Sequence, residues 1–226
     1  MILRLFCIML ILFSLAGCVS GKSRSAIKPG AMISLPQAKN DIIDYHESGE
    51  YYKDVNVLAK SIARRVKAAI NGKVRYPAVV MSVEDVLLST YNARRKQGFS
   101  DNSAARKDLY SHIILSRLPA IEPSVALFEF LLSRNVPVFI ISHRGEAVRI
   151  PVMENLSKAG FSGWKSLYMM PPNYPADLNY NEEVRRGLQK LGFNIIATVG
   201  AVPDDVAGEF TGKAVLYPNY IYSSRK

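Results

Sequence analysis

The chain has 226 residues, of which 49% are hydrophobic, and its 29 Lys and Arg against 19 Asp and Glu give a formal net charge of +10. This length is enough to bury a sizeable core without covalent cross-links. Two cysteines, Cys7 and Cys18, exclude a disulfide-rich framework and a cysteine-based metal cluster.

The first 18 residues have the pattern of a lipoprotein export signal. Arg4 supplies a positive start, and residues 5–15 are an apolar run too short for a good membrane span. Leu15-Ala16-Gly17-Cys18 then resembles a lipobox. We predict that residues 1–17 are a cleaved signal peptide and that Cys18 becomes the lipid-carrying first residue. The alternative is an uncleaved anchor helix.

Removal of the signal changes what the mature chain carries. Cys7 is lost, so the lipidated mature protein has no free thiol, and loss of Arg4 leaves a charge near +9 (28 minus 19). The residue after Cys18 is Val19, whereas an Asp at this position would favour retention at the inner membrane. We therefore predict that the mature protein is anchored at the periplasmic face of the outer membrane. A chain this basic is expected to bind acidic surfaces such as lipid phosphates. Alternatively, the charge serves only to keep the protein soluble. Nucleic acid is not an expected partner.

Beyond Cys18, a polar segment precedes a single alternating domain. Residues 18–39 are predicted to be a flexible tether, and residues 40–226 one domain. Apolar periodicity predicts helices at 41–70, 109–115, 123–134, 146–159 and 180–191. Apolar runs predict strands at 78–81, 136–141, 166–170, 194–199 and 213–216.

Strands alternating with helices indicate a doubly wound, Rossmann-like α/β domain, a parallel sheet with helices on both faces. A basic segment at about 91–118 is predicted to be a small helical cap insert, with either a solvated surface or a partner contact. Ligands of such sheets bind beyond the carboxyl ends of the strands. The residues to inspect therefore follow Met81, Ile141, Met170 and Val199.

Short segments in a fixed order carry a family resemblance. They are residues 45–51, 77–89, 140–144, 155–164, 199–208 and 216–222. In these segments the chain resembles the class B-type acid phosphatases of the haloacid-dehalogenase (HAD) superfamily. That group includes bacterial outer-membrane lipoprotein acid phosphatases and plant vegetative storage proteins. The resemblance implies a HAD-type fold.

The resemblance also implies a specific chemistry. In these enzymes an Asp after the first strand attacks phosphorus, and a second Asp two residues later acts as acid and base. Magnesium, bound by carboxylates, neutralises the phosphoryl oxygens. A hydroxyl after the second strand and a Lys from the third motif hold the same oxygens.

Most of these positions carry the wrong residue. Ser82 stands at the nucleophile, Asn181 at the expected Lys, and Ala201 at a metal-binding Asp. Glu84 stands at the acid/base position with one extra methylene, and a displacement of ~1 Å can reduce the rate ~100-fold. The resemblance therefore implies no confident catalytic residue, and this correlated loss indicates a non-catalytic descendant.

Other positions keep the family's residue types. Ser142 and Arg144 match phosphate-binding residues, His143 replaces a small Gly between them, and Asp205 with Asp204 matches the second acidic position of the metal site. Each also has a structural interpretation. Ser142 is expected to cap the next helix, and Asp204 and Asp205 to cap a helix starting near Val206. Glu84 is expected either to pair with Arg144 or to be solvated. His143 is expected to be a partly exposed loop residue, and the residues Tyr217, Tyr220 and Tyr222 are expected to pack.

We therefore predict a lipid-anchored pseudo-phosphatase that serves as a structural or binding component, with envelope proteins and the outer-membrane lipid at Cys18 as partners. No cofactor is expected. One alternative is an active acid phosphatase with atypical residues, for which Mg²⁺ would be required. Another is a non-hydrolytic module that binds phosphate or a nucleotide through Ser142 and Arg144.

Overall fold

The computed structural model describes residues 33–222. The predicted signal peptide and Cys18 lie outside the described residues. Residues 34–226 form one compact unit, and both apolar clusters found among the described residues lie within it, so this unit carries its own core. No helix of the described part is long and apolar enough to cross a membrane.

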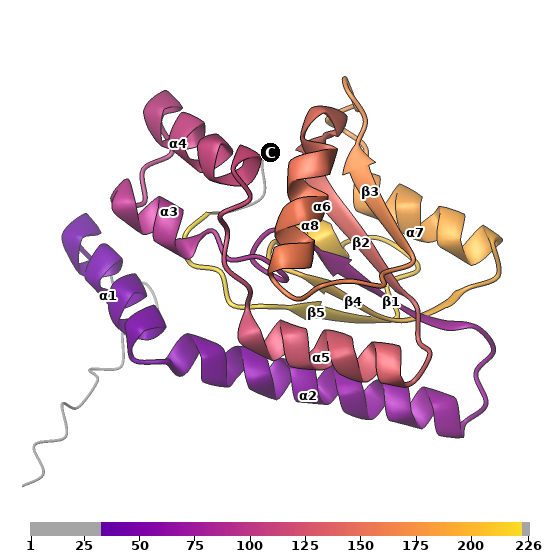
Figure 1. The fold of residues 1–226 in the computed structure, drawn as a ribbon. Coiled ribbons are helices and arrows are strands. Elements are labelled where there is room, and N and C mark those ends of the chain that lie inside the picture. The colour runs from indigo at the N-terminus through magenta and orange to yellow at the C-terminus, as the bar shows by residue number, and fades with distance from the viewer. Residues whose placement is uncertain (1–32, 223–226) are drawn as a thin grey trace, which may run out of the picture. The chain divides into compact units, whose positions relative to one another are not determined.

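A five-stranded parallel sheet is the centre of this unit (Figure 1). The strand order is β3-β2-β1-β4-β5. The strands are β1 (Pro77–Ser82), β2 (Val138–Gly145), β3 (Ser166–Met170), β4 (Asn194–Gly200) and β5 (Lys213–Leu216). Each overlaps a predicted apolar run, and β1 and β4 do so because they are mostly buried and have continuous hydrophobic sequence. The run predicted at 136–141 is shifted, because β2 begins at Val138 and continues to Gly145 through exposed and polar residues.

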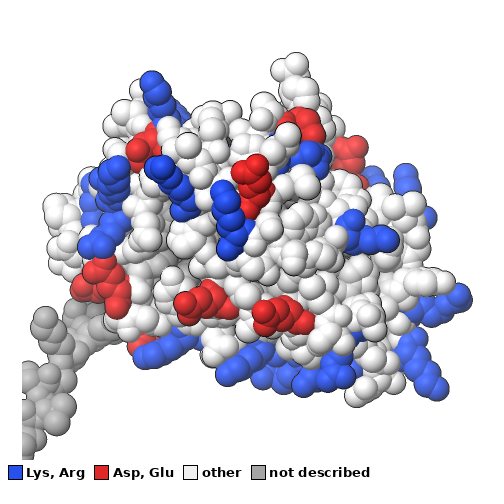
Figure 2. Space-filling model, viewed as in Figure 1, with Lys and Arg blue, Asp and Glu red and all other residues white. Residues whose placement is uncertain are grey.

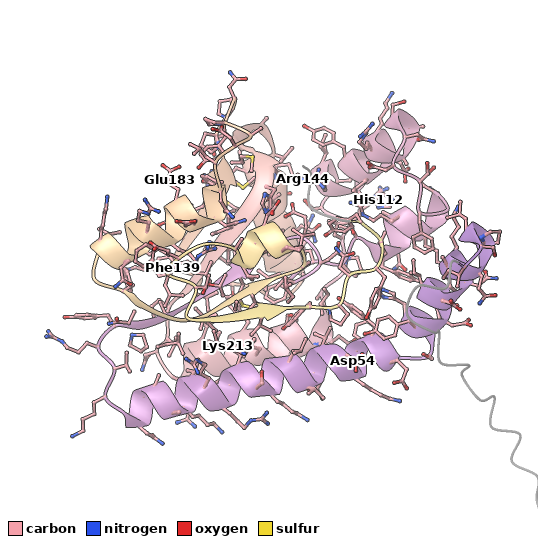
Figure 3. The ribbon with its side chains drawn as sticks, turned by 180° about the vertical axis from the view of Figure 1, so that it is seen from behind. Asp54, His112, Phe139, Arg144, Glu183 and Lys213 are labelled. Carbon is pink, nitrogen blue, oxygen red and sulfur yellow. The ribbon has the colours of Figure 1, made fainter. Side chains whose placement is uncertain are left out.

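Helices cover both faces of the sheet. They are α1 (Leu35–Glu47), α2 (Glu50–Asn71), α3 (Tyr91–Lys96), α4 (Ser103–Ile114), α5 (Glu122–Ser133), α6 (Arg149–Lys158), α7 (Tyr180–Lys190) and α8 (Pro203–Val206), with a 3₁₀ turn η1 (Glu146–Val148). Val79 and Met81 of β1 pack into the cluster that contains α2, α5 and α6, whereas Ala78 and Val80 pack with α7. Figure 3 shows Phe139 of β2 beside α7. The predicted doubly wound α/β class is confirmed.

The N-terminal helix corrects two boundaries of the sequence analysis. α1 begins at Leu35, within the predicted tether, because Ser34 Oγ accepts a hydrogen bond from Gln37 N (3.3 Å) and a proline lies in the first turn. The predicted helix at 41–70 is two helices, since Gly49 has φ 81° and breaks it. This left-handed conformation suits glycine.

The insert between β1 and α5 contains two short helices, α3 and α4, which lie to one side of the sheet next to α1 (Figure 1). Asn102 starts α4, because its side chain accepts from Ala105 N (2.9 Å). The end of the insert is fixed by Asn155 of α6. Its side chain accepts from Leu118 N (2.9 Å) and donates to Leu118 O (2.7 Å). The insert is therefore joined to the core by buried polar contacts.

Candidate functional site

The carboxyl ends of β1, β2 and β4 meet at one edge of the sheet. Ser82 is level with Ile141 in the parallel register, and Val83 N donates to Ile141 O (2.9 Å). Arg144 follows at the end of β2, near the insert (Figure 3). The turn after β1 and the end of β2 are thus side by side, as the sequence predicted for the residues that follow Met81 and Ile141.

Glu84 is the centre of the first polar cluster at this edge. Its Oε1 accepts from Ser142 Oγ (3.0 Å) and from Arg144 Nε (3.2 Å). Ser142 Oγ in turn accepts from Arg144 N (3.1 Å). The predicted Glu84–Arg144 pair is therefore present. The expectation that Ser142 caps the next helix is wrong, because its hydroxyl bonds within this cluster and the residues at the starts of η1 and α6 are Gly145 and Val148.

His143 and Asp205 form the second cluster. His143 Nε2 lies 2.7 Å from Asp205 Oδ1, while Asn181 Nδ2 lies 3.1 Å from the same ring nitrogen and 3.3 Å from Asp204 O. Burial alone lowers the pKa of His143, but the hydrogen bond and the charge of Asp205 outweigh it and raise that pKa above its ordinary value. We infer that Nε2–H donates to Asp205 and Asn181 to Asp204. The expectation that His143 is partly exposed is confirmed, but its placement in a loop is wrong, because β2 continues to Gly145 and includes it.

Both oxygens of the Asp205 carboxylate are occupied. Oδ2 accepts from Ala201 N (2.8 Å) and Val202 N (3.2 Å), and Oδ1 faces His143. The expectation that Asp204 and Asp205 start a helix near Val206 is wrong in register. α8 begins at Pro203, so Asp205 caps it from the third position. Asp205 lies close to the end of β4. A Cβ added to Gly200 would be 2.2 Å from the Cβ of Asp205, so a larger residue at position 200 would clash with Asp205.

The residues present do not fit the magnesium site that the resemblance implies. Ser82 replaces a carboxylate, Ala201 offers no side-chain oxygen, and Asp205 is already bound to protein donors. Within residues 33–222, no group of three or more His, Cys, Asp or Glu side chains is arranged to hold a metal ion. Magnesium prefers several oxygen ligands in octahedral geometry, and this donor set does not supply them.

Ser82 itself has none of the support that a nucleophile needs. It is 5% exposed, and within the described residues no hydrogen bond joins its hydroxyl to a base. A serine hydroxyl requires an adjacent general base to attack phosphorus or carbon. The cluster does leave two buried acceptors, Glu84 Oε2 and Asn181 Oδ1, without a donor among the described residues. Both atoms have almost no exposed surface, so a ligand would reach them only after a local rearrangement.

Asp85 is a site residue that the sequence analysis missed. It is 8% exposed and has φ 54°, and it accepts from Thr90 N (2.6 Å), Thr90 Oγ1 (2.6 Å) and Tyr222 OH (2.7 Å). Burial and the Asp85 charge raise the pKa of Tyr222 well above its ordinary value. A carboxylate inside an otherwise apolar run was the available signal. Asp85 joins the turn after β1 to α3 and the C-terminal segment.

Arg185 of α7 was also missed. Its side chain is 0% exposed and donates to the backbone carbonyls of Glu209 (3.1 Å), Asp205 (2.9 Å) and Ala207. Burial lowers its pKa. The guanidinium therefore fixes the loop that carries Asp205, through the backbone of that residue and not through its carboxylate.

An aromatic stack connects the N-terminal helices to the insert. The ring of His46 lies between Tyr51 (centroids 4.3 Å apart) and Tyr91 (4.0 Å), nearly parallel to both. Burial lowers the pKa of His46 to about 4, although the charge of Asp85 opposes this effect. His46 is therefore a neutral stacking ring at neutral pH.

This stack predicts a pH-dependent stability. Between the ordinary pKa of 6.5 and the folded value of about 4, the unfolded chain binds more protons, so the free energy of unfolding falls as the pH falls through this window. His46→Phe keeps a stacked ring and removes the titration. Urea unfolding at a series of pH values should show a steeper decline for the wild type than for this variant. Parallel curves would contradict the assignment.

The fold and the edge of the sheet together define a HAD-type phosphatase domain, with the motif positions in place and their residues changed. The chain belongs to subfamily IIIB of the HAD superfamily, the acid phosphatases, because the family model matches residues 19–225. The prediction of this family is confirmed.

Similarity to individual proteins agrees with this assignment. The chain is 27% identical over 145 residues to vegetative storage protein 1 of Arabidopsis thaliana, covering 63% of this chain and 54% of the relative, so the match spans about half of that protein. It is 23% identical over 195 residues to acid phosphatase 1 of Solanum lycopersicum, covering 84% and 76%. The class C acid phosphatase of Bacillus anthracis has a similar fold, with a TM-score of 0.68, 18% identity and coverage of 84% and 85%.

Proposed function

We propose that this family member is a lipid-anchored pseudo-phosphatase of the outer membrane, held there by Cys18, and that it serves as a binding or structural component of an envelope assembly. The observation that carries the proposal is that both carboxylate oxygens of Asp205 are hydrogen-bonded to protein groups. Its carboxylate is closed off by His143 and two backbone N–H groups, in a site where Ser82 replaces the nucleophile. Phosphoryl transfer by the family mechanism has neither its attacking carboxylate nor its metal ligands here.

The names of the relatives are compatible with this proposal. Some are named as acid phosphatases and others as vegetative storage proteins. One fold can host several functions, so membership of this family does not require catalysis.

The binding role is tested by capture from membranes. The lipidated full-length chain, tagged at its C-terminus, is cross-linked in cells and purified, and co-purifying proteins are identified by mass spectrometry against a Cys18→Ala control. We expect defined envelope proteins to be enriched only with the wild type, which also fractionates with the outer membrane. Recovery of lipid alone, with no enriched protein, would count against an assembly role.

A second candidate function is the binding of a phosphate-bearing ligand. A cavity of about 340 Å³ lies between α3, α4 and the end of β2, and Arg94, Arg106, Lys107 and Arg144 line it. Arg144 uses only its Nε on Glu84 among the contacts of the described residues, so its two other nitrogens are free to bind an anion. Calorimetry with inorganic phosphate and a nucleoside monophosphate at low salt tests this candidate. Heat lost in Arg144→Gln would support it, and no heat at millimolar ligand would exclude it.

A further inference from the structure

A continuous basic surface runs along α2 and the residues that follow it. Between Asp54 and Glu84 the sequence contains no Asp or Glu, but it contains six Lys or Arg. These six residues, all exposed, are called the α2 basic face: Lys60, Arg64, Arg65, Lys67, Lys73 and Arg75. A surface of one charge over such a length differs from the mixed charges of an ordinary solvated helix.

Helical spacing places Lys60, Arg64 and Lys67 on the outer side of α2, whereas Arg65 Nε donates to Ile196 O of β4 (3.3 Å) and lies at the side of the face. Val57, Lys60, Arg64 and Lys67 follow one another at intervals of three or four residues and are all exposed, so they form one stripe. The opposite stripe is buried against α5 and the sheet. Figure 2 shows Lys and Arg side chains in a row along the lower edge of the molecule, where α2 runs in Figure 1.

The cations of the α2 basic face have no acidic partners. None of the six forms an ion pair with a carboxylate of residues 33–222, whereas Lys53, Arg95 and Arg186 each contact one. Lys67 lies 5.4 Å from the centre of the Phe130 ring, and Arg134 lies 5.7 Å from the same ring. Cations gathered in this way repel one another, and an external array of anions would relieve that repulsion.

Exposed apolar side chains accompany the charges. Tyr76 is 63% exposed and has the Arg75 guanidinium 5.7 Å from its ring centre. Val57, Ile70 and Val74 are also exposed. Tyrosine and aliphatic side chains among Lys and Arg are typical of surfaces that lie in a lipid headgroup layer, where the rings and aliphatic stems enter the boundary and the charges meet phosphates.

We propose that the α2 basic face binds the headgroups of an anionic phospholipid bilayer, with α2 lying along the membrane plane. The basic part of α2, from Lys60 to Asn71, has 12 residues and makes a straight contact of about 18 Å. The cellular setting rests on the anchoring proposed at Cys18. The 16 residues from Cys18 to Ile33 reach at most ~55 Å when extended, which keeps the face within range of the membrane.

Vesicle binding of residues 34–226, the unit with its own core, tests the face without any lipid anchor. Vesicles of phosphatidylcholine alone are compared with vesicles that contain about 30% phosphatidylglycerol, at salt from about 0.05 to 0.5 M. The patch variant carries Lys60→Gln, Arg64→Gln, Lys67→Gln and Lys73→Gln. The matched control carries Lys96→Gln, Arg117→Gln, Lys158→Gln and Lys190→Gln, which removes the same charge from exposed positions elsewhere.

The wild type should bind only the anionic vesicles and dissociate as salt rises. The patch variant should bind on the order of a hundredfold more weakly, because each cation near the surface contributes separately, and the control should stay within about threefold of the wild type. Equal losses in the two variants would show a net-charge effect and overturn the proposal. The proposal would also be overturned if the wild type bound the vesicles equally with and without phosphatidylglycerol, including the case in which it bound an acidic protein instead. Because no anchor is used, either result leaves the proposed function at Cys18 to its own test.

Discussion

Replacing Arg185 by methionine will lower the free energy of unfolding by about 3 to 5 kcal/mol. Methionine matches the length of the buried stem but leaves the carbonyls of Asp205, Ala207 and Glu209 without their donor. Each unsatisfied buried polar group costs about 1 to 3 kcal/mol, and partial entry of water limits the sum. Urea denaturation followed by circular dichroism measures the change.

Arg186→Met is the matched control for this prediction. Arg186 is the next residue of α7, is exposed and pairs only with Glu182 one turn away. Such surface pairs contribute little, so the same substitution should change the free energy of unfolding by less than about 1 kcal/mol. Arg185→Lys keeps the charge with fewer donors in the right directions and should fall between the two. Equal effects at positions 185 and 186 would show that the buried contacts do not hold the loop.

Replacing Asp85 by alanine will destabilise the protein by about 3 to 4 kcal/mol. The change removes the acceptor of three short hydrogen bonds, two from Thr90 and one from Tyr222. It also puts alanine at φ 54°, a left-handed conformation that Asp tolerates better. Denaturation of this variant and of the exposed-site control Asp101→Ala measures the difference, since the control should stay within about 0.5 kcal/mol of the wild type.

The partner of Asp85 gives a second readout. Tyr222→Phe removes one of the three bonds and should cost about 1 kcal/mol. Because the Asp85 charge contributes to the raised pKa of Tyr222, this pKa should fall towards its ordinary value in Asp85→Ala. An ultraviolet titration detects this shift. An unchanged Tyr222 titration in Asp85→Ala would contradict the contact even if stability were reduced.

The sequence predicted the sheet well and the polar connections poorly. The strands at 166–170 and 213–216 match β3 and β5 at both ends, because each is a short run bounded by turn residues. Burial is not the signal at β5, where Val215 is its single buried residue. Arg185 resembles a solvated charge on a strongly amphipathic helix. Its acceptors are backbone carbonyls about 20 residues further along the chain, which no local pattern encodes.

At the candidate site, the sequence identified the residues but not their arrangement. The Glu84–Arg144 pair follows from opposite charges at adjacent strand ends, and it was predicted. The His143–Asp205 contact was not, because it depends on α8 starting at Pro203 and on the close approach that Gly200 allows. The register of a four-residue helix is decided by such tertiary contacts rather than by its own sequence.

The central proposal is that this edge of the sheet does not catalyse phosphoryl transfer. Its most direct test is hydrolysis of a generic phosphomonoester by purified residues 34–226 with added Mg²⁺ at acid pH, with an active acid phosphatase run in parallel. We predict no phosphate release above the buffer background, and no change in Glu84→Ala. Mg²⁺-dependent turnover that Glu84→Ala abolishes would contradict the proposal, because it would show that Glu84 still serves as acid and base in a working phosphatase.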